Sequence, residues 1–273
     1  MSNRIISIIF CLITTFLVNN AFSNQEPLSA FDVVKKMDTK YDGDTLTSDT
    51  LMVLLDRSNN KRVREIKNIR KDYGDDTKGL VFFNSPADVR NTSYMSFDWD
   101  AADKEDDSWL YLPALKKIKR IASSDKSSSF MGSDFTYSDI NGMDIDNWDY
   151  TFKNESAMID GVDTWIIDGR PKENKKVKVL DETGYIRSNL WIRKENFMLV
   201  KGKYWVKKGK KIKYYKADVI KEIDGVWTAT NLSMVTTKKG KVLHSSLLKI
   251  SNIVYNSDIN DSMFTTGRME RGL

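Results

Sequence analysis

Residues 199–254 read LVKGKYWVKKGKKIKYYKADVIKEIDGVWTATNLSMVTTKKGKVLHSSLLKISNIV, and this stretch decides the fold. Three short turn sequences, Lys208-Gly209-Lys210, Asp224-Gly225 and Lys239-Gly240, interrupt runs that are rich in β-branched and aromatic residues. Such turns between β-rich runs are typical of β-hairpins. We therefore predict four consecutive antiparallel strands in this part of the chain.

The first of these strands has one apolar face and one charged face. Its apolar and lysine residues alternate, with Met198, Val200, Tyr204 and Val206 on one parity and Lys201, Lys203 and Lys207 on the other. A strand with this alternation belongs to an antiparallel sheet that is wet on one side. Residues 51–55, by contrast, are apolar at every position. We expect a helix, a loop or a ligand to cover their second face.

Two more hairpins and one helix are predicted towards the N-terminus. Ser58-Asn59-Asn60 separates residues 46–56 from 62–71, and Asp160-Gly161 separates 151–159 from 164–168. Ser29 and Asp32 form a capping-box-like start for a helix over residues 30–39. The pattern as a whole predicts a single, mostly antiparallel β domain with few helices.

The first 23 residues indicate export. Arg4 is followed by the apolar run IISIIFCLITTFLV and then by a small-x-small sequence that ends at Ser23. This order is typical of a secretory signal peptide, and the run is shorter than the roughly 20 apolar residues of a membrane span. We expect cleavage after residue 23 and a periplasmic domain over residues 24–273. Cys11, the single cysteine, would be removed with the signal peptide.

Charge is unevenly distributed along the chain. Residues 24–150 carry 18 Lys and Arg against 24 Asp and Glu, whereas residues 151–273 carry 24 against 14. The basic half is either a solvated surface or a face that approaches anionic lipid headgroups or an acidic partner. A signal peptide would export the protein away from nucleic acid, so nucleic acid is not an expected partner.

Little in the sequence supports catalysis. The chain has one histidine, His244, and no cysteine after residue 23, so zinc sites and Ser-His-Asp or Cys-His machinery lack ligands or partners. The acidic run at residues 98–107 lacks the ligand order of an EF-hand. No pair of carboxylates stands out for glycoside hydrolysis. We expect no enzyme activity, no metal and no cofactor.

One segment does not follow the pattern of strands joined by short turns. Residues 122–140 are rich in serine, yet they contain Phe130, Met131, Phe135 and Tyr137. Long loops inside compact domains are usually functional or disordered. Two interpretations remain, a plain loop and a mobile flap docked through these four apolar residues, and we favour the flap.

A resemblance to a known family rests on the central segment. WLYLPALKK at residues 109–117, KRIASS at 119–124 and FMGSDFTYSD at 130–139 resemble the hallmark stretch of LolA-like outer-membrane lipoprotein-sorting proteins. FNSPAD at 83–88, WIRKE at 191–195, IDGVW at 223–227 and FTTGRMER at 264–271 resemble other elements of that family. The resemblance therefore extends over most of the chain after the signal peptide.

The resemblance implies a strongly curved antiparallel sheet, an incomplete barrel, whose apolar concave face is covered by helices or loops. It also implies a carrier that shields the acyl chain of a lipid or lipoprotein on its way to the outer membrane, in some cases beside a transporter of the resistance-nodulation-division (RND) type. The alternative is a non-catalytic envelope sensor or transporter accessory. From the residue pattern we expect the cavity to be lined by Leu51, Val53, Leu55, Trp109, Tyr111 and Trp191.

A last expectation concerns the turn at Gly209. Eight lysines and no acidic residue lie between Lys201 and Lys216. They either protect the sheet from aggregation or dock on an anionic membrane surface. For docking we single out Lys207, Lys208, Lys210 and Lys211.

Overall fold

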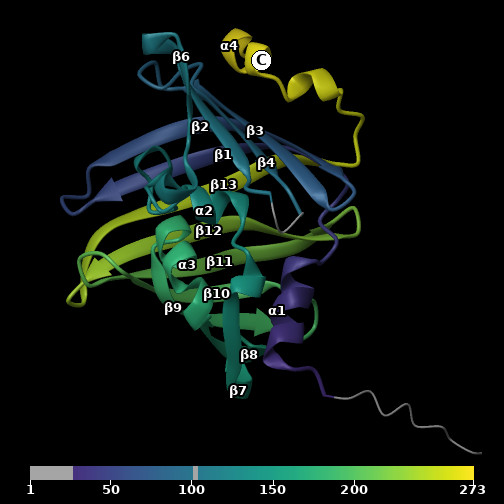
Figure 1. The fold of residues 1–273 in the computed structure, drawn as a ribbon, viewed down its shortest axis with the longest axis vertical. Helices are drawn as coiled ribbons and strands as arrows, with labels where there is room; N and C mark the ends of the chain where they lie inside the picture. Colours follow the sequence, from purple (N-terminus) through teal and green to yellow (C-terminus); the bar gives the residue numbers. More distant parts are fainter. Residues whose placement is uncertain (1–26, 101–103) are drawn as a thin grey trace, which may run out of the picture.

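The computed structural model describes residues 27–100 and 104–273, so the predicted signal peptide at residues 1–23 lies outside the described residues. One sheet of thirteen antiparallel strands forms the body of the protein (Figure 1). The strands are β1 Thr45–Asp56, β2 Lys61–Tyr73, β3 Asp76–Ser85, β4 Ser93–Asp98, β5 Asp107–Leu112, β6 Lys117–Arg120, β7 Trp148–Ile159, β8 Val162–Pro171, β9 Tyr185–Arg193, β10 Leu199–Val206, β11 Lys211–Ile223, β12 Val226–Lys238 and β13 Lys241–Tyr255. The helices are α1 Ala30–Asp38, α2 Tyr137–Asn141, α3 Lys176–Glu182 and α4 Thr266–Arg271.

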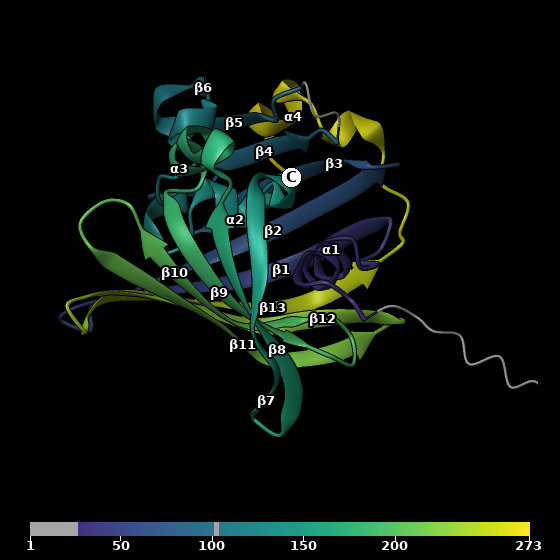
Figure 2. The same cartoon turned by 60° about the horizontal axis from the view of Figure 1, so that its bottom comes forward.

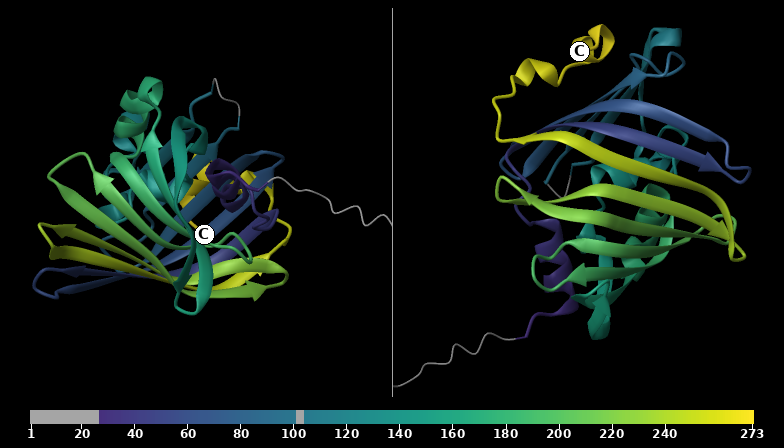
Figure 3. Two further views of the ribbon diagram at one scale, coloured as in Figure 1. Left: turned by 90° about the horizontal axis from the view of Figure 1, so that it is seen from below. Right: turned by 180° about the vertical axis from the view of Figure 1, so that it is seen from behind.

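The strand order is β6-β5-β4-β3-β2-β1-β13-β12-β11-β10-β9-β8-β7. The first and last strands, β1 and β13, therefore pair in the middle of the sheet, with Met52 opposite Leu248. The two edge strands, β6 and β7, are consecutive in sequence. The sheet curves strongly without closing into a barrel, as Figures 2 and 3 show. This confirms the predicted incomplete barrel.

The hairpin turns lie where the sequence predicts them. Asp160-Gly161, Asp224-Gly225 and Lys239-Gly240 each have two consecutive residues with positive φ. Two-residue turns of this kind match the right-handed twist of paired strands, which is why glycine occupies the second position. The turns fix strand register and hence which residues face the concave side.

The concave side of the sheet, called the inner face below, is filled by helix α1 and by residues 121–147, called the plug. Helix α1 begins with the predicted capping box, in which the Ser29 hydroxyl accepts from the Asp32 amide and the Asp32 carboxylate accepts from the Ser29 amide. Its Val33 and Val34 are fully buried in the inner core. The plug connects β6 to β7 across the concavity and contains α2 and three short 3₁₀ turns, Ser123–Asp125, Phe130–Gly132 and Ile145–Asn147.

The convex side, called the outer face, has a second apolar core. The C-terminal segment, which includes helix α4, lies over β2–β5 (Figure 1). Ile259, Phe264 and Met269 from this segment pack on Leu80 and Met95 of the sheet. Among the described residues no helix has the length and apolarity needed to cross a membrane.

Candidate functional site

A cavity of about 710 Å³ opens at one end of the sheet, between the inner face, the plug and helix α3. Pockets for small ligands are commonly about 300–1,000 Å³ in volume. The strands that contribute are β1, β2 and β9–β13, together with turns that join them. Residues of the plug between Ser124 and Thr136 form a further part of its wall.

The apolar part of the wall comes from several elements. It includes Leu54 and Leu55 of β1, Leu180 of α3, Val206 of β10 and Leu243 of β13. Leu54 is 4% exposed and belongs to the inner core, so the cavity is continuous with that core. These side chains can contact a hydrocarbon chain without leaving a polar group unpaired.

A buried aspartate of the plug organises the polar wall. The carboxylate of Asp134, with 1% of the side chain exposed, contacts Nδ1 of His244. The same carboxylate accepts hydrogen bonds from Thr236 and, at 2.7 Å, from the Ser246 hydroxyl. The Asp134 backbone amide donates to Ser246 Oγ at 2.8 Å. Because a buried carboxylate is costly unless it is hydrogen-bonded, these contacts fix the plug on the sheet.

A second aspartate of the plug makes a similar contact further in. The Tyr185 hydroxyl donates to Asp139 at 2.8 Å, and Lys213 Nζ lies 3.7 Å from the same carboxylate. Burial lowers the pKa of Lys213, and the nearby Asp139 carboxylate offsets part of this lowering. Burial and the Asp139 charge raise the pKa of Tyr185 well above its usual value, so the phenol stays protonated. The polar contacts of these two aspartates thus attach the plug to strands β9, β11, β12 and β13.

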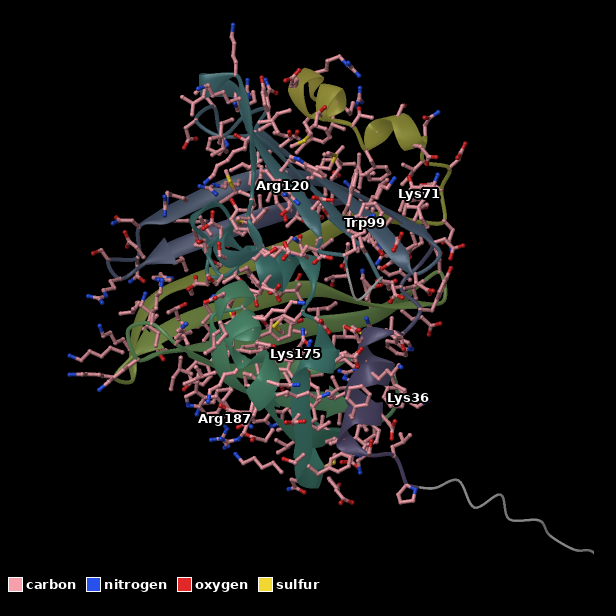
Figure 4. All side chains as sticks on the ribbon, viewed as in Figure 1. Lys36, Lys71, Trp99, Arg120, Lys175 and Arg187 are labelled. Atoms are coloured by element: carbon pink, nitrogen blue, oxygen red, sulfur yellow. The ribbon has the colours of Figure 1, made fainter. Side chains whose placement is uncertain are left out.

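The rim of the cavity is strongly basic. Antiparallel strands turn alternately at the two ends of a sheet, so the β1–β2, β10–β11 and β12–β13 turns share one end (Figure 1). In Figure 4, side chains ending in nitrogen extend from these tips at the left. The three tips carry Arg57, Lys61, Arg62, Lys207, Lys208, Lys210, Lys211, Lys238, Lys239 and Lys241. The opposite end has the acidic turn residues Asp75, Asp76, Glu222 and Asp224.

The arrangement suits binding better than acyl transfer. His244 beside Asp134 resembles the base and its orienting acid in a hydrolase triad. However, Ser246 and Thr236 donate to the aspartate, and no serine among residues 27–100 and 104–273 hydrogen-bonds to the imidazole. His244 is therefore not positioned to activate a serine nucleophile among the described residues. The basic side chains at the rim of the cavity can instead donate hydrogen bonds to an anionic group.

The predicted flap residues all lie in or against the inner core. Phe130, Phe135 and Tyr137 are buried, and Met131 packs on the same cluster. The Phe130 ring is 5.4 Å from that of Tyr94 and 5.3 Å from that of Tyr137. The segment predicted as a flap is therefore the plug, and its aromatic residues dock on the sheet.

Strand parity corrects most of the predicted cavity lining. Trp109 and Tyr111 pair with Met95 and Ser93 and belong to the outer core under the C-terminal segment. Trp191 lies beside Lys201 and Tyr214 at a separate hollow of about 210 Å³. Since successive residues of a strand face opposite sides, choosing the wrong parity moves a residue across the sheet.

Two of the three β1 residues that were predicted to line the cavity also face the other side of the sheet. Leu51 and Val53 alternate with the inner residues Met52 and Leu54, and Leu51 is 37% exposed on the outer face. Leu55, at the strand end, does line the cavity. Of the four predicted docking lysines, Lys207, Lys208 and Lys211 also line the cavity, whereas Lys210 lies at the same tip without doing so.

Sequence reasoning missed Asp134, His244, Arg57 and Arg62 as parts of one site. His244 has no neighbour in the sequence that indicates Asp134 as its partner, and the arginines flank a turn about 150 residues from the lysine turn. The sequence signal that could have identified this site is that successive turns of an antiparallel meander lie at opposite ends of the sheet. It places residues 57–62 and 207–211 at the same end of an antiparallel meander whose first and last strands pair.

The curved open sheet with a covered concave face defines the LolA-like class of fold. A LolA superfamily protein from Nitrosomonas europaea has a TM-score of 0.66 at 16% identity, covering 89% of this chain and 100% of that chain. A protein domain from Vibrio parahaemolyticus described as outer membrane lipoprotein-sorting has a TM-score of 0.76 at 24% identity, covering 89% and 98%. These similarities confirm the LolA-like fold that the resemblance implied.

The model of a family described as "-like: Uncharacterized protein" matches residues 75–271, and the chain belongs to that family. A solved DUF1329 family protein from Desulfovibrio piger is 28% identical to the chain, with a TM-score of 0.78 and coverage of 88% of this chain and 97% of that chain. No curated protein matches the chain.

Proposed function

We propose that the protein is a periplasmic carrier that shields the acyl chain of a lipid or lipoprotein during transport towards the outer membrane, without catalysing a reaction. The observation that carries this proposal is the cavity between the inner face and the plug, whose apolar wall is continuous with the core. The LolA-like fold supports it. The apolar segment at residues 5–18 supports export through a signal peptide.

The physical reason for such a carrier is the cost of hydrocarbon in water. Exposing an acyl chain costs about 0.8 kcal/mol for each CH₂ group. A chain that crosses the periplasm therefore needs a shielding pocket and no chemistry. In this protein the plug borders the pocket, where polar contacts of Asp134 and Asp139 and its buried aromatic side chains hold it on the sheet.

Native mass spectrometry of the protein purified from periplasm tests the proposal. We expect co-purifying lipid or acylated peptide, and binding of a fluorescent fatty acid in solution. The variant Leu180→Glu places a carboxylate in the apolar wall and should weaken fatty-acid binding at least about tenfold, because burying that charge is costly.

The matched control for that experiment is on the same helix. Val177 of α3 is 75% exposed and does not line the cavity, so Val177→Glu should bind the fatty acid like the parent protein. A ligand-free protein that ignores fatty-acid probes would contradict the carrier proposal. In that case a pull-down from solubilised envelope should recover the protein partner expected of a sensor or transporter accessory.

The basic rim also supports docking on an anionic membrane leaflet, which would bring the cavity mouth to the lipid. Each lysine near such a surface contributes on the order of 1 kcal/mol. We expect salt-sensitive binding to anionic vesicles and none to zwitterionic vesicles. Changing Lys207, Lys208, Lys210 and Lys211 to Gln should weaken this binding, and unchanged binding at low salt would place the docking surface elsewhere. An RND-type transporter at the membrane is the partner we propose for loading.

A further inference from the structure

The cavity rim holds more positive charge than the protein itself neutralises. The lining includes Arg57, Arg62, Lys207, Lys208 and Lys211 at its mouth. Lys207 lies 3.6 Å from Asp181. In the part of the chain that the structure describes, the other four cations form no ion pair.

The carboxylates of the cavity are already engaged. Asp134 is satisfied by His244, Thr236 and Ser246. Asp56 accepts from the backbone amide of Ser58 and from the amide groups of Asn60 within its own turn. Asp181 is beside Lys207. Asp56 keeps its charge and attracts Arg62 without forming an ion pair with it, so the mouth of the cavity retains more positive than negative charge.

These cations come from two hairpins on opposite sides of the mouth. Arg57 and Arg62 flank the β1–β2 turn, whereas Lys208 and Lys211 flank the β10–β11 turn. The β12–β13 hairpin lies between them in the sheet. A ligand at the mouth can thus be contacted by guanidinium groups from one side and ammonium groups from the other, an arrangement that suits phosphate oxygens.

Polarity changes along the cavity wall. Serine hydroxyls also line the cavity, and those of Ser124, Ser127 and Ser245 donate no hydrogen bond among the described residues. The hydroxyls of Ser129, Ser133 and Ser246 donate within the protein. Leu54, Leu180 and Val206 supply the apolar wall. A ligand that satisfies both parts has an anionic polar end and a hydrocarbon end. An amphiphile with an uncharged polar end would leave four cations unpaired.

We propose that the cavity selects an amphiphile whose polar end carries a phosphate, held by Arg57, Arg62, Lys208 and Lys211. This inference rests on the proposed carrier function and names its class of cargo. The acyl chain occupies the apolar wall, and the phosphate accepts hydrogen bonds from the rim and from the serine hydroxyls. Selection by charge then discriminates between lipids that have the same acyl chains.

Calorimetric titration with three soluble probes separates the parts of the ligand. Dihexanoyl phosphatidic acid has both the phosphate and the chains, dihexanoyl glycerol lacks the phosphate, and glycerol 3-phosphate lacks the chains. We expect phosphatidic acid to bind at least about tenfold more tightly than either of the others, because each lacks one set of contacts. Equal binding of dihexanoyl glycerol would overturn the inference and leave the carrier function standing. Equal binding of glycerol 3-phosphate would also overturn it, since the site would then bind free phosphate compounds.

Two charge-matched variants test the residues. The first changes Arg57, Arg62, Lys208 and Lys211 to Gln, and the second changes Lys210, Lys238, Lys239 and Lys241 to Gln. Both remove four positive charges from the same end of the sheet, yet only the first set lines the cavity. The first should bind phosphatidic acid about tenfold or more weakly, and the second should stay within about twofold of the parent. Equal losses in the two variants would show long-range attraction without a built site and would refute the assignment.

The failure of this inference is distinguishable from the failure of the carrier function. Leu180→Glu should weaken every probe that has acyl chains, including dihexanoyl glycerol. If the quadruple cavity variant keeps its affinity while Leu180→Glu loses it, the carrier function stands and the phosphate selection falls. If neither variant changes the binding of any probe, both proposals are wrong.

Discussion

Replacing Phe130 with alanine tests whether the plug is part of the folded core. The Phe130 side chain is 2% exposed and contacts the rings of Phe83, Tyr94 and Tyr137 at centroid distances of 6.0, 5.4 and 5.3 Å. Removing a buried phenylalanine costs about 3–5 kcal/mol. For a domain of this size, 1 kcal/mol shifts Tm by about 2–4 °C, so the expected decrease is on the order of 10 °C.

The assay is thermal unfolding followed by near-ultraviolet circular dichroism, with amide exchange of the plug as a second readout. Leu115→Ala is the control, since Leu115 is 62% exposed and should change the stability by less than about 0.5 kcal/mol. If the plug opens independently of the sheet, Phe130→Ala would increase exchange within residues 121–147 and leave Tm close to that of the control. That result would refute our description of the plug as part of the global core.

Three further predictions concern other parts of the molecule. Partial burial alone would raise the pKa of Asp168, but hydrogen bonds from Arg187, Arg170 and Asn189 outweigh it and hold the pKa below its usual value. The resulting stabilisation is present above the unfolded pKa near 4 and is lost as pH falls through the folded pKa. The Tm difference between Asp168→Asn and the parent protein should therefore shrink below pH 4. A Tm difference that grows on acidification would contradict this prediction. Met269→Ala should cost about 2–5 kcal/mol in urea denaturation because Met269 is fully buried in the outer core, and a near-neutral result would mean that the C-terminal segment does not stabilise the sheet. Ser29→Ala removes the capping box of α1 and should cost about 1 kcal/mol, whereas Ser29→Asp should retain most of the stability.

The sequence predicted the strands well where local chemistry determines them. Asp-Gly and Lys-Gly turns need positive φ, which few residues adopt, so their positions fix the hairpins directly. The same holds for the Ser29 capping box, whose contacts are local. These signals do not depend on what packs against the sheet.

The cavity residues could not be predicted in the same way, because their assignment depends on distant segments. Residues 109 and 111 have apolar or aromatic side chains on the outer face since the C-terminal segment covers it there, so apolarity alone did not identify the concave side. Asp134 and His244 are 110 positions apart and meet only because the plug crosses the concavity. The basic end of the sheet was predicted in part, from the lysines on either side of Gly209. The arginines of the β1–β2 turn can be assigned to the same end only once the strand order is known.

The pairing of β1 with β13 in the middle of the sheet has a consequence for folding. Every other ladder joins strands that are neighbours in sequence, so β1–β6 and β7–β13 can each form by successive local hairpins. The β1–β13 ladder instead requires closure of a loop that contains almost the whole domain, and such contacts form slowly because chain entropy opposes them. We therefore expect two meanders to form first, with the central ladder completing the sheet as the rate-limiting step.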